Sequence, residues 1–333
     1  MAGAIAGTAL VDFAPHLTRK LTTITLTINN LCNLSCPHCY LQYKPSKSSN
    51  YISQQVMNAV EETSFKHLVI VGKEPLVNSH SQEIVGKIVS ANVKRGKTIG
   101  LITNGLKLSK LAQSSAADLS YIDVSFDGGK ETYHLYRKAD FGEVIGNIHA
   151  VSRNLPHLQF NALHVVNLST ARHISDMVNV KNYANFNKIM FSPYIETKND
   201  GENTVERLPI RIVLEKFASN PDFMYTENAF ILLDIYHLLG ESKLFHDEGF
   251  NSMNEIKNTV LSLGLEGKVK LIENDPLSHG FLRVTYDGYL LSPYKSLDPS
   301  YYRETGNHVS KIEIDEYFRN ITFNPSAFIA HAN

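Results

Sequence analysis

The chain has 333 residues, of which 43% are hydrophobic and 20% are charged, a composition typical of a globular protein with one large domain, alone or with an appendage. Its 32 Lys and Arg residues almost balance its 33 Asp and Glu residues, and no basic block is present, so nucleic-acid binding is not indicated. No apolar run is long enough to span a membrane. Neither a nucleic acid nor a membrane is therefore an expected partner.

The first 200 residues predict an arm followed by a repeated strand–helix pattern. The start of the chain, residues 1–16, is apolar and has no basic segment before it, which favours an N-terminal arm over residues 1–20 rather than a signal peptide. From residue 21 onward, β-branched runs alternate with segments of helical periodicity. The predicted strands are 22–28, 67–72, 98–103, 121–126, 159–166 and 188–194. The predicted helices are 53–63, 80–95, 109–117, 141–154 and 173–185, with Ser53 and Asp140 as N-caps of the first and fourth.

Six such units in a row predict an α/β fold with a parallel sheet and right-handed crossovers. Whether the sheet is open or closed, the functional site of such a fold lies at the carboxyl ends of its strands. We therefore assign residues 21–200 to a core domain and look for the site in the loops that follow its strands.

The pattern changes near residue 196, and residues 201–333 are predicted to form a C-terminal extension of helices and a hairpin. The predicted helices of this part are 209–219, 226–240, 251–263 and 311–320. Residues 281–294 read as a β-hairpin, with Asp287-Gly288 as its turn.

All three cysteines of the chain, Cys32, Cys36 and Cys39, lie within eight residues directly after the first predicted strand. An odd, clustered set of thiols is a poor basis for disulfides, which places the protein in the reducing cytoplasm. Three thiolates in one loop can bind a metal centre in two ways. One is a structural zinc site with His38 as the fourth ligand, although His38 directly adjoins Cys39. The other is an iron–sulfur cluster in which one iron has no protein ligand.

The C-x3-C-x2-C spacing resembles the signature of the radical S-adenosylmethionine (SAM) enzymes, and further motifs follow in order at the ends of successive predicted strands. The sequence GKEP at 72–75 is similar to the family's Gly-Gly-Glu-Pro, with a lysine in place of the second glycine. The sequence TNG at 103–105 resembles the family's Thr-Asn-Gly, and VSFDG at 124–128 resembles its Ser-x-Asp-Gly. Arg137 follows in HLYRKADF. The resemblance covers about residues 20–200.

This resemblance implies a partial (β/α)6 TIM-like barrel with a small C-terminal α/β extension. It also implies a [4Fe–4S] cluster on the three cysteines, with SAM on its open iron. Main-chain groups at 72–74 are expected to contact the amino group of SAM, and Arg137 to neutralise its carboxylate. The residues expected to bind SAM are His38, Gly72, Lys73, Glu74, Asn104, Ser125, Asp127 and Arg137.

The family's chemistry is implied with the fold. SAM is cleaved reductively to a 5′-deoxyadenosyl radical, which abstracts hydrogen from a substrate, and an external one-electron donor such as flavodoxin or ferredoxin supplies the electron. We expect a small-molecule or short-peptide substrate, and specialised-metabolite tailoring (natural product biosynthesis) as the setting. Candidate catalytic or substrate-facing residues are His164, Tyr194, Glu196 and Tyr294. A SAM- and cluster-binding module without turnover and a zinc-stabilised barrel are the alternatives.

The sequence VTYDGYLLSPY at 284–294 resembles the hairpin that opens an auxiliary cluster site in SPASM and twitch extensions. Tyr294 stands where the cysteine would be, and no cysteine follows Cys39. The extension is therefore expected to lack a second cluster, which favours a redox-neutral reaction. Without a cysteine, a tyrosine is the candidate hydrogen donor. The tyrosines of the hairpin region are Tyr286, Tyr289, Tyr294, Tyr301 and Tyr302.

Overall fold

The computed structural model of the protein describes residues 20–39, 50–111, 113–194, 205–234, 249–272, 280–291, 303 and 306–320. Its strands are β1 (Thr23–Thr27), β2 (His67–Val71), β3 (Thr98–Thr103), β4 (Tyr121–Ser125), β5 (Gln159–Val166), β6 (Lys188–Pro193), β7 (Ala229–Asp234), β8 (Val269–Ile272), β9 (Phe281–Val284), β10 (Tyr289–Leu291) and β11 (Asn307–His308). Its helices are α1 (Gln54–Glu62), α2 (Ser79–Val93), α3 (Gln113–Ala117), α4 (Tyr133–Arg137), α5 (Phe141–Asn154), α6 (Ile174–Val178), α7 (Ile210–Ala218), α8 (Pro221–Tyr225), α11 (Met253–Ser262) and α13 (Ile314–Asn320).

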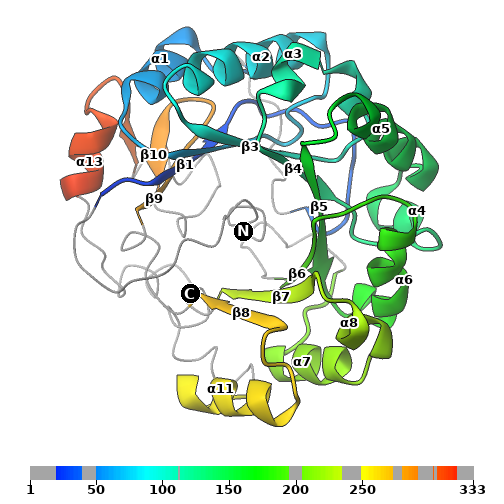
Figure 1. Ribbon diagram of the computed structural model, residues 1–333. Coiled ribbons are helices and arrows are strands. Elements are labelled where there is room, and N and C mark those ends of the chain that lie inside the picture. Colours follow the sequence, from blue (N-terminus) through cyan, green and yellow to red (C-terminus); the bar gives the residue numbers. More distant parts are fainter. Residues whose placement is uncertain are drawn as a thin grey trace.

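The described strands form one eleven-stranded sheet in the order β11-β10-β9-β1-β2-β3-β4-β5-β6-β7-β8. The strands from β1 to β8 run parallel, and β9 runs parallel to β1 on its other side. The sheet curves into an incomplete barrel with the helices on its outer face (Figure 1). Within the described residues β8 and β11 are its two end strands, so the barrel is not closed. The predicted partial α/β barrel is confirmed.

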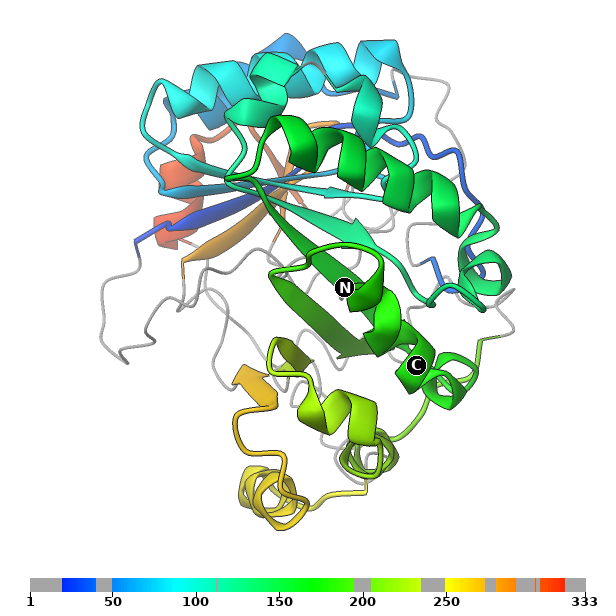
Figure 2. The same cartoon turned by 45° about the vertical axis from the view of Figure 1, so that its right-hand side comes forward.

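The six strands predicted before residue 200 are present with small changes at their ends, as are the helices 53–63, 80–95 and 141–154. The predicted helices 109–117 and 173–185 are instead the short helices α3 and α6, each next to a 3-10 turn, at Leu108–Lys110 and Asn179–Asn182. The strands 98–103 and 159–166 and the helix 141–154 have the predicted bounds. Ser53 caps α1 by accepting a hydrogen bond from the main chain of Val56, and Asp140 caps α5 in the same way. The long helices α2 and α5 lie across the outer face of the strands (Figure 2). None of the described helices is both long and apolar enough to cross a membrane.

Side chains alternate between the two faces of the curved sheet, as they do along any strand. On β4, Ile122 and Val124 are fully buried in the hydrophobic core beneath the helices. Asp123 and Ser125 lie on the opposite face, which forms the inside of the barrel. The inner face therefore carries the polar residues from which a site can be built, while the outer face supplies the apolar contacts that hold the helices.

The predicted helix at 226–240 is wrong for residues 229–234, which form β7 between β6 and β8. The sequence AFILL at 229–233 is a continuous apolar run because β7 has a neighbouring strand on both sides and is covered on its outer face. Such a run cannot be distinguished from a buried helix by periodicity. Residues 235–240 lie outside the described residues. The sheet thus continues past residue 200, and the boundary between core and extension remains a prediction.

The predicted hairpin is confirmed for β9 and β10, which pair antiparallel. Gly288 in its turn has a φ of 85°, a left-handed conformation that favours glycine. A Cβ at this position would also lie 2.6 Å from Nε2 of His308. Because β9 pairs with β1, the hairpin belongs to the same sheet as the strands before residue 200.

Candidate functional site

The cysteine loop, residues 29–39, follows the carboxyl end of β1. All three cysteines are half-buried and free of disulfides. The side chain of Asn29 fixes the start of the loop by accepting from the main chain of Leu31 at 3.2 Å and by donating to the main-chain oxygen of Glu74 at 2.8 Å. Further along, Asn33 accepts from Asn104 at 2.9 Å. The loop is therefore bonded to the loops that follow β2 and β3.

One cavity brings together the cysteine loop and the carboxyl ends of the inner strands; we call it the strand-end cavity. It is lined by every residue predicted to bind metal or cofactor: Cys32, Cys36, His38, Cys39, Gly72, Lys73, Glu74, Asn104, Ser125, Asp127 and Arg137. These residues span more than one hundred positions of sequence and come from several loops. Their contact with cofactor remains a prediction, but their convergence on one space is a finding.

A buried ionic cluster, which we call the Asp127 network, forms one wall of the cavity. Oδ2 of Asp127 accepts from Nη1 of Arg137 at 2.8 Å and lies 2.8 Å from Nε2 of His38. Oδ1 accepts from the main chain of Val165 at 2.6 Å. The side chains of Asp127, His38 and Arg137 are only 4%, 5% and 11% exposed. Burial alone would raise the pKa of Asp127, but His38 and Arg137 hold it well below its ordinary value.

The backbone of the loop after β4 is fixed by a residue that the sequence did not single out. Asp176 of α6 accepts from the main chain of Gly129 at 3.2 Å and from the hydroxyl of Thr132 at 2.6 Å. A Cβ at Gly129 would lie 1.9 Å from the main-chain oxygen of Asp176, so only glycine fits there. This packing holds the segment between Asp127 and Arg137. The adjacent glycines in SFDGG were the only sequence signal for it.

Glu74 is buried and connects two loops. Its carboxylate accepts from the hydroxyl of Thr103 at 2.6 Å and from the main chain of Asn104 at 2.7 Å. Contact of this residue with SAM would therefore be through its main chain, as the sequence predicts for 72–74. Gly72 is required because a Cβ would lie 2.8 Å from Oδ1 of Asn29. Lys73 replaces the second glycine at no conformational cost, because its φ is negative. Among the described residues other than glycine, those with a positive φ are Asp127 and Lys138.

The three thiols are placed so that they can hold a metal centre. Burial raises the pKa of Cys36 to about 11 and also raises that of Cys32, so a bound cation is needed for either to be a thiolate at neutral pH. Arg137 opposes the effect of burial on Cys36, and its carbonyl oxygen lies 4.0 Å from the Cys36 sulfur. Three free thiols that line one cavity supply three ligands and leave one iron open, so the residues present fit an iron–sulfur cluster.

The zinc alternative has less support from the geometry. Among the described residues, no three His, Cys, Asp or Glu side chains converge as the ligands of one metal ion do. His38, the fourth ligand in that alternative, instead lies against Asp127 through Nε2. A cluster of four irons is larger than one ion and requires ligands that are spaced farther apart.

His164 lines the strand-end cavity and its ring also packs against core residues, so its role in facing a substrate stays a prediction. The ring stacks on Phe191 at 5.0 Å and lies 6.1 Å from Phe126, both of which belong to the core beneath the helices. Alternation along β5 explains this, because Leu163 and Val165 occupy the positions that face the barrel. Burial lowers the pKa of His164 to about 4, so the ring is neutral.

The other candidate residues have mixed outcomes. Tyr194 follows β6, is 4% exposed and lines the strand-end cavity. Glu196 and Tyr294, with Tyr301 and Tyr302, lie outside the described residues. Tyr286 is buried beside the hairpin and accepts from Nη2 of Arg303 at 3.2 Å. Neither Tyr286 nor Tyr289 lines the cavity, so the described structure does not bring a hairpin tyrosine to it.

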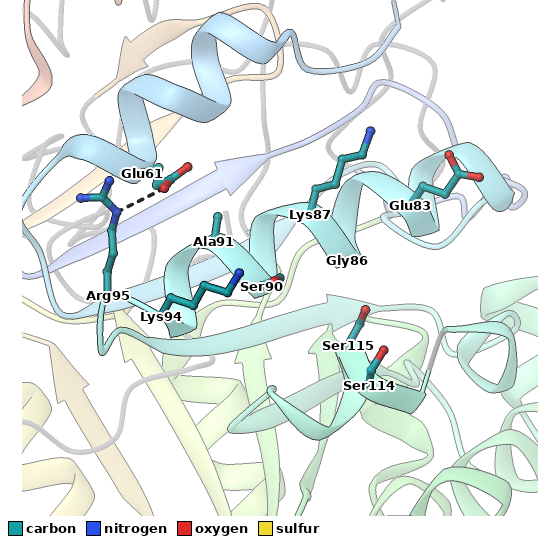
Figure 3. Close-up of a pocket in the computed structure, with 10 residues that line it drawn as sticks. All are labelled: Glu61, Glu83, Gly86, Lys87, Ser90, Ala91, Lys94, Arg95, Ser114 and Ser115. Carbon is teal, nitrogen blue, oxygen red and sulfur yellow. Dashed lines mark hydrogen bonds and ion pairs between the residues drawn. The ribbon is translucent and has the colours of Figure 1, made fainter.

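The far side of the cavity was not predicted from the sequence. It is formed by the apolar side chains of Leu163, Met190 and Leu232, with Ser192 and Tyr194 as its polar groups. Leu163, Met190, Ser192 and Leu232 lie on β5 to β7, and their side chains are on the inner face of the sheet, opposite the core beneath the helices. A second hollow lies on the outer helical layer, over α1, α2 and α3, where Arg95 pairs with Glu61 at 3.2 Å (Figure 3). It contains no residue of the cysteine loop.

Comparison with known proteins identifies the domain around the cavity. Residues 26–178 match the model of the Radical SAM superfamily. A probable GTP 3',8-cyclase of Methanocaldococcus jannaschii is 28% identical over 171 residues, covering 50% of this chain and 55% of that protein. The GTP 3',8-cyclase of Shewanella denitrificans is 28% identical over 140 residues, covering 40% of this chain and 41% of that protein. The chain spans about half the length of the curated relatives it matches.

Solved structures share the fold. Streptococcus suis SuiB bound to S-adenosylmethionine has a TM-score of 0.58 at 10% identity, over 90% of this chain and 66% of that one. Native anSMEcpe with bound AdoMet and Kp18Cys peptide has a TM-score of 0.59 at 20% identity, over 92% of this chain and 82% of that one. At these identities the likeness shows the fold alone.

The family match begins within β1 and ends with α6, so it contains the cysteine loop and all of the strand-end motifs up to Arg137. The same stretch supplies the ion pair and the buried thiols of the strand-end cavity. Sequence match, motif order and convergence of the motifs in space agree. Residues 26–178 therefore form a radical SAM domain, and the cofactors of that family are a [4Fe–4S] cluster and S-adenosylmethionine.

Proposed function

We propose that this chain is a radical SAM enzyme whose single cluster is held by Cys32, Cys36 and Cys39. When bound, the cluster and SAM supply a 5′-deoxyadenosyl radical that abstracts hydrogen from a substrate. The observation that carries the proposal is the convergence of three free thiols and the Asp127 network on one cavity at the strand ends.

The residues around the cavity have separable roles in this proposal. Arg137 keeps guanidinium nitrogens beyond the one that bonds Asp127, so it can also bind the carboxylate of SAM. Asp127 already has partners at both oxygens, which supports a role in positioning Arg137 and His38. Ser125 lines the cavity at the end of β4 and is the side-chain hydroxyl available for a ligand there. Asn104 and Glu74 hold the loops from which main-chain groups face the cofactor.

The substrate would enter against the apolar wall formed by Leu163, Met190 and Leu232. Close packing of that wall excludes water from a reactive radical and orients the reacting carbon. The named relatives act on GTP, which makes a nucleotide one candidate substrate class for this chain. A small-molecule metabolite or short peptide, as in specialised-metabolite tailoring, is the other; the named relatives give it no support.

We further propose that the reaction is redox-neutral. All thiols of these 333 residues lie in one loop, which provides for one cluster. An external one-electron donor of the flavodoxin or ferredoxin type, and a cytoplasmic location, complete the proposal. Both rest on the family's chemistry and on the clustered thiols.

The test begins with anaerobic reconstitution of the protein with iron and sulfide. The enzyme should hold about four irons per chain and, with dithionite and SAM, should form 5′-deoxyadenosine. A variant with all three cysteines replaced by alanine should do neither. Cluster and SAM binding without cleavage would establish the binding-module alternative, and stoichiometric zinc without iron would establish the zinc-stabilised barrel. Addition of GTP then decides between the substrate classes, because only a nucleotide-dependent enzyme converts it.

A further inference from the structure

Arg137 lies between the carboxylate of Asp127 and the cysteine loop. Its Nη1 donates to Oδ2 of Asp127 at 2.8 Å, and its carbonyl oxygen lies 4.0 Å from the sulfur of Cys36. The side chains of the ion pair are 11% and 4% exposed. Salt and water screen buried charges much less than exposed ones. Each charge of the pair therefore acts on any charge carried by the three sulfur atoms.

The two charges act on the sulfur atoms with opposite sign. Asp127, Arg137 and the three cysteines line the same cavity. A buried cation there stabilises negative charge on the sulfur atoms, and a buried anion destabilises it. Because the two charges are opposite and lie 2.8 Å apart, their effects on the loop oppose each other.

We infer that Asp127 and Arg137 each shift the reduction potential of the cluster held by the cysteine loop, with Arg137 raising the potential and Asp127 lowering it. Reduction adds one electron, supplied by the external donor, and makes the cluster more negative by one charge. A neighbouring cation favours that change and a neighbouring anion opposes it. The inference rests on the proposed function, since it requires the cluster.

Each partner remains in place when the other is made neutral. Asp127 retains its bonds to the main chain of Val165 and to His38 if Arg137 becomes glutamine. At position 127 the φ is 49°, a conformation that asparagine tolerates well, and asparagine can still accept from Val165. Arg137→Gln therefore leaves a buried anion near the cluster, and Asp127→Asn leaves a buried cation there.

The experiment is a redox titration of the reconstituted protein without SAM, monitored by electron paramagnetic resonance of the reduced cluster. At the wild-type midpoint, the ratio of reduced to oxidised cluster should fall at least tenfold in Arg137→Gln and rise at least tenfold in Asp127→Asn. A tenfold change corresponds to about 59 mV for a one-electron couple. The double variant should return to within threefold of wild type, because it removes both charges.

The surface ion pair of Arg95 and Glu61 supplies matched controls (Figure 3). Its side chains are 48% and 33% exposed, so solvent screens their charges. Arg95→Gln and Glu61→Gln make the same charge changes and should leave the ratio within twofold of wild type.

Opposite shifts of the ratio of reduced to oxidised cluster in the two single variants indicate an electrostatic role. Loosened packing would shift this ratio in the same direction in both variants. Shifts of the same sign, or shifts within twofold, in variants with wild-type iron content would overturn the inference and leave the proposed function intact. If Arg137→Gln loses its iron, Asp127→Asn decides alone: a raised ratio supports the inference, and an unchanged or lowered ratio overturns it. A wild-type chain that binds no cluster would overturn both the inference and the proposed function.

Discussion

Glu74 accepts a hydrogen bond of 2.6 Å from the hydroxyl of Thr103, and this contact joins the loop after β2 to the loop after β3. The same carboxylate accepts from the main chain of Leu76 at 2.9 Å and of Asn104 at 2.7 Å. Glu74 is only 1% exposed. Burial raises the pKa of Glu74, while the three donors oppose that rise. The carboxylate therefore organises two loops of the cavity instead of facing a ligand.

Glu74→Ala should lower the free energy of unfolding by about 3 kcal/mol, because it leaves three buried donors without an acceptor. Urea unfolding of the reconstituted protein measures this change. The exposed Glu83 of α2 is the control, since Glu83→Ala should change stability by less than about 0.5 kcal/mol. Equal effects of the two substitutions would show that the contacts of Glu74 contribute nothing beyond those of a surface residue.

Arg137→Ala should weaken SAM binding at least tenfold, about 1.4 kcal/mol, while the iron content stays at the wild-type level. The physical reason is loss of the guanidinium that would pair with the carboxylate of SAM. It also leaves Asp127 as a buried carboxylate without its cation, which would repel that same group. Equilibrium dialysis with labelled SAM is the measurement, with Arg95→Ala as the control. Unchanged SAM affinity in Arg137→Ala would remove this residue from the cofactor site.

Much of the site was predictable because each motif directly follows a strand with a clear boundary. Parallel strands place their carboxyl ends at one edge of the sheet, so motifs separated by tens of residues must meet there. This is how the cysteine loop and Arg137 come to line one cavity. The predicted N-caps Ser53 and Asp140 were equally local, since each depends on a main-chain group three residues away.

The features that could not be predicted depend on which face of an element is covered. His164 reads as a polar strand residue, but only the register of β5 places its ring against Phe191. The bond of Asp176 to Gly129 crosses from α6 to the loop after β4, and the adjacent glycines in SFDGG do not indicate which residue packs against them. The strand β7 is read as a helix until its neighbours β6 and β8 are known, because an apolar run has no period.

The redox-neutral proposal predicts that product and substrate differ by no loss of hydrogen. Once a substrate is known, the mass of the product and the amount of 5′-deoxyadenosine should be measured in the same reaction. Loss of two hydrogens per turnover, with one 5′-deoxyadenosine formed each time, would show that one cluster suffices for an oxidation and would refute the proposal. An enzyme that re-forms SAM should instead form far less 5′-deoxyadenosine than product.

Asp123 of β4 should make the stability of the protein fall as the pH rises from about 4 to 8. The carboxyl is fully buried on the inner face of the barrel and accepts from Asn161 at 2.7 Å. Burial raises its pKa from 3.8 to about 8, more than the bond from Asn161 and the charge of Lys188 lower it. The folded chain therefore holds a proton that the unfolded chain has released, and each pH unit in this window lowers the contribution of Asp123 to folding by up to about 1.4 kcal/mol.

Asp123→Asn removes this dependence, because asparagine resembles the protonated acid and carries no charge at any pH. The variant should gain stability relative to wild type between pH 6 and pH 8, by about 1 to 3 kcal/mol in urea unfolding. Asp118→Asn changes an exposed position before β4, and its free energy of unfolding should equal that of the wild type at both pH 6 and pH 8. A constant difference between wild type and Asp123→Asn at the two pH values would mean that the buried carboxyl is charged throughout. Asn161 and Lys188, its two neighbours, would then compensate its burial more strongly than the contacts indicate.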